Sequence, residues 1–414
     1  VTYLEKCKNQ EALLEQLSEF DFAQLKALYE TTKKPVEIEE SQIEPIKYVD
    51  KNKLPKEEVE ALEEAGRKVI RDGDYAVVTM AGGQGTRLGH KGPKGTFLVD
   101  VEPEPKYIFQ ILAESLIRQN KAYGITIPWY IMTSEENNEE TITFLEKHAY
   151  FGYPKESVTF FKQGKLPIMN LDGKLLINKD GLIREASDGN GSIYPSLAKS
   201  GMLDKMKQQN VKWVFIGVVD NILLNMVDPL LIGLCQKDKN QIASRTVTKI
   251  NPQERVGVFC KKKGHPAVIE YTEIPEEMAE EVDEEGELFY GEAHIACTLY
   301  SMEALEKASK IQSQYHIAVK KMSYLDEAGN WIEPEKPNAY KFESFIFDVF
   351  EAFDDISILR SKREENFAPI KNREGNDSPE TARKLYNQQI NKEREEREWR
   401  IFPLLLWLLE KTAE

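Results

Sequence analysis

The sequence is poor in cysteine and in long apolar segments. Four cysteines occur among 414 residues, and no two of them form a CxxC pair: Cys7, Cys235, Cys260 and Cys297. This spacing excludes a disulfide-rich scaffold and a zinc ribbon, and it is typical of proteins in a reducing compartment. No apolar run reaches the roughly 20 residues that a membrane-spanning helix needs. We therefore expect a cytoplasmic protein that does not span a membrane.

Positive charge is also in deficit. The chain has 55 Lys and Arg against 70 Asp and Glu, which gives a formal net charge of −15. A protein that binds nucleic acid normally carries a basic surface, so we expect no nucleic-acid partner. The overall acidity does not forbid a local basic pocket. Hydrophobic residues make up 41% of the chain, which is enough for a packed core.

The hydrophobic pattern divides the chain into three parts. Residues 1–72 are expected to be a helical region. Leucines recur every three or four positions from residue 13 to 28, which predicts a helix there. A proline-interrupted linker is expected over 34–55 and a charged helix over 56–71. Residues 73–375 are expected to form the catalytic domain. Residues 376–414 are expected to be a small C-terminal helical segment, whose Leu- and Trp-rich end packs on its own domain or on a partner.

Short apolar runs alternate with helical patterns in the middle part. The runs at 75–80, 129–133 and 213–219 predict buried strands, residues 109–118 predict a helix, and residues 242–300 are more typical of antiparallel strands. Strands that alternate with helices indicate an open α/β sheet, and such sheets bind ligands at the carboxyl ends of their strands.

A glycine-rich segment follows the first of these strands directly. Its sequence, MAGGQGTRLGHKGPKG over residues 80–95, contains Arg87 and Lys94 between glycines. Because glycine has no side chain, the backbone N–H groups of such a segment can approach and bind a polyphosphate, and the two cations can neutralise its charge. No Walker A string occurs, and a GxGxxG fingerprint counted from Gly83 fails because Leu88 stands at its last position. A flexible surface loop is the alternative interpretation.

The motif AGGQGTRLG followed by PKG resembles the signature of the UDP-N-acetylhexosamine pyrophosphorylases, within the wider group of UDP-sugar pyrophosphorylases. The residues between, KGPK at 91–94, are closer to the UDP-glucose pyrophosphorylase version. Further blocks of the family follow in order over roughly three quarters of the chain: FKQGKLP at 161–167, DGNG at 188–191, VDNI at 219–222, EY at 270–271, KPN at 336–338, FIFD at 345–348 and FAPIKN at 367–372. Ser192 replaces the last glycine of the family's DGNGG.

The resemblance implies a Rossmann-like, GT-A-like nucleotidyltransferase fold with a central mixed sheet flanked by helices. It also implies a reaction in which a sugar-1-phosphate oxygen attacks the α-phosphorus of UTP and pyrophosphate leaves. Arg87 and Lys94 would hold the triphosphate, and Lys371 would reach the α- and sugar phosphates, with Lys341 a weaker candidate. Asp220 would bind Mg²⁺; its alternative role is the N-cap of a helix that begins at Asn221.

The resemblance also implies how the nucleoside and the sugar are recognised. Nucleotide contacts fall on the backbone of Ala81, Gly82 and Gly83 and, for the uracil edge, on Gln163 and Gly189. Sugar contacts fall on Asn190, Gly257, Glu270, Phe345 and Phe347, although the spacing of the two phenylalanines equally fits core packing. The family's AGNIANHFF is EAHIACTLY here, so that its sugar-contacting asparagine falls on His294.

The leading hypothesis is an enzyme that makes UDP-N-acetylglucosamine and pyrophosphate from UTP and N-acetylglucosamine-1-phosphate, with Mg²⁺ as cofactor. One alternative is the same chemistry on glucose- or galactose-1-phosphate, because replacement of an amide by His294 can alter recognition of the sugar 2-position. Another is a UDP-sugar-binding regulatory protein without turnover. Retention of Arg87, Lys94, Asp220 and Lys371 together argues against this last hypothesis.

Overall fold

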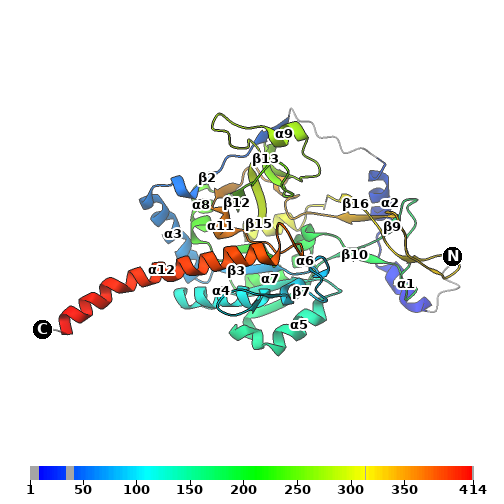
Figure 1. Ribbon diagram of the computed structural model, residues 1–414. Helices are drawn as coiled ribbons and strands as arrows, with labels where there is room; N and C mark the ends of the chain where they lie inside the picture. The colour runs from blue at the N-terminus through cyan, green and yellow to red at the C-terminus, as the bar shows by residue number, and fades with distance from the viewer. Residues whose placement is uncertain (1–8, 34–41, 313, 413–414) are drawn as a thin grey trace.

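The computed structural model describes residues 9–33, 42–312 and 314–412. A mixed sheet runs through the centre of the molecule, with helices on both of its faces (Figure 1). From one edge to the other its strands are β2 (Val49–Asp50), β20 (Ser357–Arg360), β12 (Ile242–Thr248), β15 (Glu292–Ser301), β11 (Trp213–Val218), β3 (Tyr75–Met80), β6 (Trp129–Thr133) and β7 (Val158–Lys162). The predicted strands at 75–80, 129–133 and 213–219 are therefore confirmed as β3, β6 and β11.

Strand direction changes at β15. The strands β11, β3, β6 and β7 are parallel to one another, whereas β15 is antiparallel to both β11 and β12. The strands β13 (Val258–Lys262), β14 (His265–Ile269) and β1 (Ile43–Pro45) extend this region with antiparallel pairs. The predicted antiparallel character of residues 242–300 is confirmed, and the parallel half brings several strand ends to one edge of the sheet.

Two apolar cores cover the two faces of the sheet. Alternate residues of the fully buried strand β3 face opposite cores, Tyr75 and Val77 one way and Ala76 and Val78 the other. The first core holds α3 (Lys56–Arg71), α4 (Ile108–Tyr123), α5 (Asn138–Lys147), α8 (Pro229–Asp238) and the start of α12 (Pro379–Thr412). The second holds α6 (Ile193–Lys199), α7 (Met202–Gln208) and α10 (Met302–Ala308). The predicted α/β fold is confirmed.

The N-terminal helices α1 (Gln10–Ser18) and α2 (Phe22–Thr31) pack away from the central sheet. They contact a small lobe built from the sheet β16 (His316–Lys320), β19 (Ala339–Glu343) and β9 (Met169–Asn170) and the pair β8 (Lys165–Pro167) and β10 (Glu185–Ser187) (Figure 1). The helix α3, in contrast, packs on α8. The boundaries proposed at residues 72 and 375 stay a prediction.

The linker predicted over residues 34–55 is wrong in its second half. Residues 43–45 and 49–50 are the strands β1 and β2, which pair with β13 and β20 and so belong to the main sheet. Proline is compatible with an edge strand, and Pro45 lies at the end of one. Residues 34–41 lie outside the described part of the chain.

The C-terminal helix is confirmed as α12, although the side chains of its Leu- and Trp-rich end, residues 404–409, lie outside the described set. Cys7 also lies outside the described residues. Within 9–33, 42–312 and 314–412, no helix is long and apolar enough to cross a membrane.

The helices α3 and α8 cross in direct backbone contact. A Cβ atom placed on Gly66 would lie 2.0 Å from the carbonyl oxygen of Pro229, and one placed on Gly233 would lie 2.0 Å from that of Leu62. No side chain fits at either position, so two glycines set how closely these helices approach. Because α3 covers the sheet beside β3, this crossing also supports the strand that precedes the glycine-rich loop.

We predict that Gly66→Ala and Gly233→Ala each lower the free energy of unfolding by about 3 kcal/mol, because the added methyl group forces the helices apart. Helix propensity alone would change stability the other way, by about 1 kcal/mol. Urea unfolding of both variants measures the effect, and Ala65→Gly on the exposed face of α3 calibrates the propensity. Stability equal to or above that of the wild type would contradict the role given to this crossing.

Candidate active site

The glycine-rich segment folds back on itself after β3. The amide of Lys94 donates to the carbonyl of Gly83 (3.0 Å), and that of Gly85 donates to the carbonyl of Gly92 (2.9 Å). This narrow loop places Arg87 in an exposed 3₁₀ turn, Thr86–Leu88, and brings Lys94 back to its base. Within the described chain, the N–H groups of Gly82 and Gly83 donate no hydrogen bond, so they are available to a ligand.

Lys94 and Asp220 form an ion pair at the carboxyl ends of β3 and β11. The distance from Lys94 Nζ to Asp220 Oδ2 is 3.1 Å, and the two side chains are only 17% and 15% exposed. The other carboxylate oxygen, Asp220 Oδ1, is buried and accepts no hydrogen bond from the described residues. The helix-cap alternative for Asp220 is wrong, because a turn follows it and the next helix, α8, begins at Pro229 with Asp228 as its cap.

Lys371 reaches the same place from the other end of the chain. The side chain of Asn221 donates to the carbonyl of Asn366 (2.8 Å) and accepts from the amide of Ala368 (2.9 Å). The amide of Ile370 donates to the carbonyl of Asp220 (2.8 Å). These bonds attach residues 366–370 to the turn after β11, so Lys371 follows directly, with its Nζ 3.9 Å from Asp377 Oδ2.

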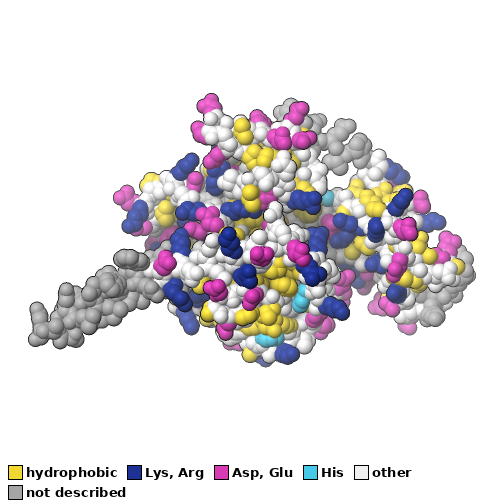
Figure 2. Space-filling view, in the orientation of Figure 1, with side chains coloured by type: hydrophobic (Ala, Val, Ile, Leu, Met, Phe, Trp, Pro, Cys, Tyr) yellow, Lys and Arg dark blue, Asp and Glu magenta, His cyan; other side chains and the backbone are white. Residues whose placement is uncertain are grey.

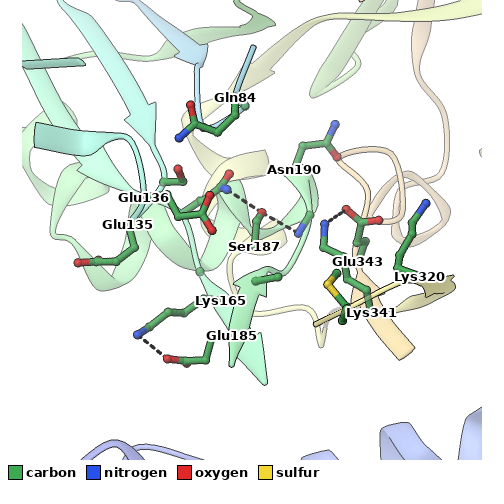
Figure 3. A pocket seen from close by; sticks show the side chains of 18 of the residues that line it. Gln84, Glu135, Glu136, Lys165, Glu185, Ser187, Asn190, Lys320, Lys341 and Glu343 are labelled. Atoms are coloured by element: carbon green, nitrogen blue, oxygen red, sulfur yellow. Dashed lines mark hydrogen bonds and ion pairs between the residues drawn. The ribbon is translucent and has the colours of Figure 1, made fainter. Parts of the chain in front are cut away.

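A cavity of about 1240 Å³ opens in front of these charges. Most of the predicted site residues line it: Gly82, Gly83, Arg87, Lys94, Gln163, Gly189, Asn190, Asp220, Phe345 and Lys371, with the weaker candidate Lys341. Its opposite wall comes from the small lobe and from α1. Figure 3 shows Lys341 paired with Glu343, and Lys165 paired with Glu185, on that wall.

The predicted nucleoside contacts lie together, with one exception. The side chain of Gln163 lies directly over Gly82, and its Nε2 donates to Ser187 Oγ (2.6 Å). Gly189 has φ +94°, and a Cβ there would lie 2.1 Å from the carbonyl oxygen of Ser344, so only glycine fits. Ala81 does not line the cavity, because its amide donates to Met132 and its carbonyl accepts from Asn137.

The predicted sugar contacts divide between the cavity and its surroundings. Phe345 lines the first cavity and also a second one of about 1030 Å³, which Glu270 lines as well. Gly257 lies next to the carboxylate of Glu270. Phe347 is buried in the second core, as the packing alternative predicts, and stacks on Phe345 at 5.2 Å between ring centroids.

His294 lies behind this wall, among aromatic rings. Its ring centroid is 5.2 Å from that of Phe259 and 5.3 Å from that of Phe347, and neither cavity is lined by it. Its Nε2 is buried and has no partner among the described residues. Burial, with a smaller contribution from the Lys371 ammonium, lowers the pKa of His294 to about 3. The imidazole is therefore neutral at physiological pH.

Several cavity residues were not predicted. Lys165 is part of the FKQGKLP motif and was the easiest to find, whereas Ser187, Glu185 and Glu343 carried no signal of their own. Helix α1 contributes Glu15 and Gln16, and Glu19 follows its last residue, whereas the amphipathic pattern of α1 indicated only a helix. In the sequence, nothing distinguishes the charged residues of the small lobe from ordinary solvent-exposed ones, and this includes Lys320 and Lys321.

We predict that His294→Gln changes the pH dependence of stability. As the pH falls from 8 to 5, an unfolded histidine takes up a proton near pH 6.5 while the folded His294 stays neutral, so the wild type loses folding free energy that the glutamine variant keeps. The variant should therefore gain about 2 kcal/mol relative to the wild type over this range. Urea titrations at both pH values measure it, with the exposed His265→Gln as control. If the difference in unfolding free energy between variant and wild type is the same at pH 8 and pH 5, a neutral His294 would be contradicted.

Comparison with known proteins agrees with this geometry. A sequence model of the family described as "UTP--glucose-1-phosphate uridylyltransferase" matches residues 18–400. The chain is 38% identical over 332 residues to the human "UDP-N-acetylhexosamine pyrophosphorylase-like protein 1", covering 78% of this chain and 65% of that protein. It is 38% identical over 333 residues to the "UDP-N-acetylglucosamine pyrophosphorylase" of Saccharomyces cerevisiae, covering 78% and 70%.

A solved structure is similar over nearly the whole chain. The uridine diphosphate N-acetylglucosamine pyrophosphorylase of Trypanosoma brucei, in complex with an inhibitor, superposes with a TM-score of 0.80 at 30% identity, covering 93% of this chain and 80% of that one. The present chain spans about two thirds of the length of the human relative. By sequence and by fold, the chain belongs to the UTP–glucose-1-phosphate uridylyltransferase family, the wider group that its motifs resemble.

Proposed function

We propose that the protein is a uridylyltransferase that forms UDP-N-acetylglucosamine and pyrophosphate from UTP and N-acetylglucosamine-1-phosphate. The observation that carries the proposal is the convergence of Lys94, Asp220 and Lys371 at the strand ends, beside free loop amides and a cavity of about 1240 Å³. Two polyanions must meet in this reaction, so the protein contributes mainly position and positive charge. The names of the yeast and trypanosome relatives support the choice of sugar.

In this proposal Arg87 and Lys94 hold the triphosphate and stabilise the charge that develops on the departing pyrophosphate. Lys371 lies between the nucleotide and the sugar phosphate and neutralises both. Its position is fixed by the hydrogen bonds of the 366–370 segment rather than by its own side chain. Asn190 and Phe345 form the sugar side of the cavity, and Gln163 presents an amide that can both donate to and accept from uracil.

Asp220 is the proposed ligand of Mg²⁺. Its Oδ1 is buried and unpaired among the described residues, which fits a cation, while its Oδ2 is held by Lys94. In the described chain no cluster of three or more His, Cys, Asp or Glu side chains could hold a metal ion. The remaining ligands would therefore be phosphate oxygens and water, as is usual for Mg²⁺, which when bound neutralises phosphate charge.

The same chemistry on glucose- or galactose-1-phosphate is the second candidate. The description of the matching family favours it. A regulatory protein that binds UDP-sugars without turnover is the third. We also propose a cytoplasmic location, supported by the free, buried thiols of Cys235, Cys260 and Cys297.

We predict that the purified protein releases pyrophosphate from UTP and Mg²⁺ fastest with N-acetylglucosamine-1-phosphate. Each sugar-1-phosphate is supplied in turn, and kcat/KM is compared across the set. Faster turnover of glucose-1-phosphate would replace the preferred substrate by the second candidate. If the protein binds a UDP-sugar tightly but releases pyrophosphate with none of the sugar-1-phosphates, only the hypothesis of a regulatory protein would remain.

We predict that Asp220→Asn lowers kcat at least about 100-fold and weakens Mn²⁺ binding in the presence of UTP, because an amide keeps the shape of the carboxylate but not its charge. Steady-state rates give the first quantity, and electron paramagnetic resonance of free Mn²⁺ gives the second without requiring turnover. Asp100→Asn, which removes an exposed carboxylate, is the matched control. Unchanged Mn²⁺ binding in Asp220→Asn would remove this residue from the metal site.

A further inference from the structure

His316, the first residue of β16, lies between two carboxylates that come from different parts of the chain. Its Nδ1 is 3.0 Å from Glu273 Oε1, and its Nε2 is 3.0 Å from Asp348 Oδ1. Carboxylate oxygens only accept hydrogen bonds, so both ring nitrogens must carry a proton to satisfy both contacts. Burial lowers the pKa of His316, but the hydrogen bonds to Asp348 and Glu273 outweigh it and raise the pKa to about 10. The side chain is therefore an imidazolium at neutral pH.

Each of the two carboxylates belongs to a turn that carries a proposed sugar contact. Asp348 Oδ2 accepts from the amide of Phe345 (2.6 Å), and the amide of Asp348 donates back to the carbonyl of Phe345 (3.0 Å). The amide of Glu273 donates to the carbonyl of Glu270 (2.9 Å). A single charged ring thus joins the turn that presents Phe345 to the turn that presents Glu270.

His316 also contacts Phe345 directly. The two ring centroids are 4.6 Å apart, with the planes inclined by 43°, and a cation this close to an aromatic ring adds attraction. Phe345 in turn stacks on Phe347, which is buried in the second core. His316 lines the second cavity but not the cavity that holds Lys94 and Asp220, so it supports the wall from behind.

We propose that His316 is a positioning residue for the sugar half of the substrate. It ties β16 of the small lobe to the turns of Phe345 and Glu270, and so holds the aromatic wall and the carboxylate at a fixed separation. This inference rests on the function proposed above, and it assigns to His316 no contact with the reacting phosphates. Loss of the ring should therefore weaken recognition of the sugar while leaving recognition of the uridine and its phosphates intact.

The test compares binding of UDP-N-acetylglucosamine with binding of UDP by isothermal titration calorimetry. We expect His316→Ala to weaken UDP-N-acetylglucosamine binding about tenfold and UDP binding less than twofold. The KM for the sugar-1-phosphate should rise by a similar factor, with the KM for UTP unchanged. The two carboxylates lie on opposite sides of the ring, so the side-chain amide of His316→Gln can donate to only one of them. Its affinity for UDP-N-acetylglucosamine should therefore lie between those of the wild type and His316→Ala.

The matched control is His148→Gln. His148 is half-buried among the aromatic rings of Tyr107, Phe144 and Phe151 at the end of α5, outside both cavities, so this variant should change neither affinity. Equal weakening of both ligands in His316→Ala, or no weakening, would overturn the inference. If that variant does not fold, Glu273→Gln is used instead, because it weakens one of the two contacts of His316. For the inference to stand, this variant must also weaken UDP-N-acetylglucosamine binding more than UDP binding, by a smaller factor.

The wild type separates this inference from the function on which it rests. A wild-type protein that turns over a sugar-1-phosphate, or binds its UDP-sugar, while His316→Ala shows no selectivity would refute the positioning role alone. A wild-type protein that neither releases pyrophosphate nor binds any UDP-sugar would refute the proposed function, and the role of His316 with it.

Discussion

The candidate site depends on the hydrogen bonds that attach residues 366–370 to the turn after β11. Asn221 uses both ends of its amide for this, and the backbone of Asp220 accepts the last bond. Without them Lys371 would belong to a surface loop. With them, Lys371 lines the same cavity as the ion pair of Lys94 and Asp220. The charged centre is thus held mainly by backbone and amide groups, which do not titrate.

This arrangement reconciles the acidity of the protein with the anionic substrates proposed for it. A net charge of −15 produces a field that repels phosphates. Cations that line the cavity act instead at short range. They are Arg87, Lys94 and Lys371 on one side and Lys165, Lys320, Lys321 and Lys341 on the facing lobe, where carboxylates such as Glu185 and Glu343 also line it. The side chains of Lys94 and Asp220 are mostly buried, so their interaction is less screened by solvent than that of a surface pair. The space-filling view in Figure 2 shows acidic and basic side chains interspersed over the face that it draws.

The sequence was sufficient for the parts whose signal is local. The strand β3, the glycine-rich loop and the strand that ends before Asp220 could all be predicted, because apolar runs and glycines have a direct structural meaning. Lys371 could be predicted only through family resemblance, since nothing around it distinguishes it from other loop lysines. The roles of β1 and β2 were missed, because an edge strand of only two or three residues is too short to show a periodic pattern. His316 was missed because its partners, Glu273 and Asp348, are brought together only by the tertiary fold.

The lining of the first cavity begins at Ala12 in α1 and ends at Lys371, so it combines residues that are far apart in the sequence. During synthesis, the wall formed by α1 and the small lobe cannot be completed until β19 has left the ribosome, and the charged centre must wait for the segment after Asn366. No shorter product of translation contains a finished cavity. Premature termination before this point therefore yields a chain that lacks a cation of its site.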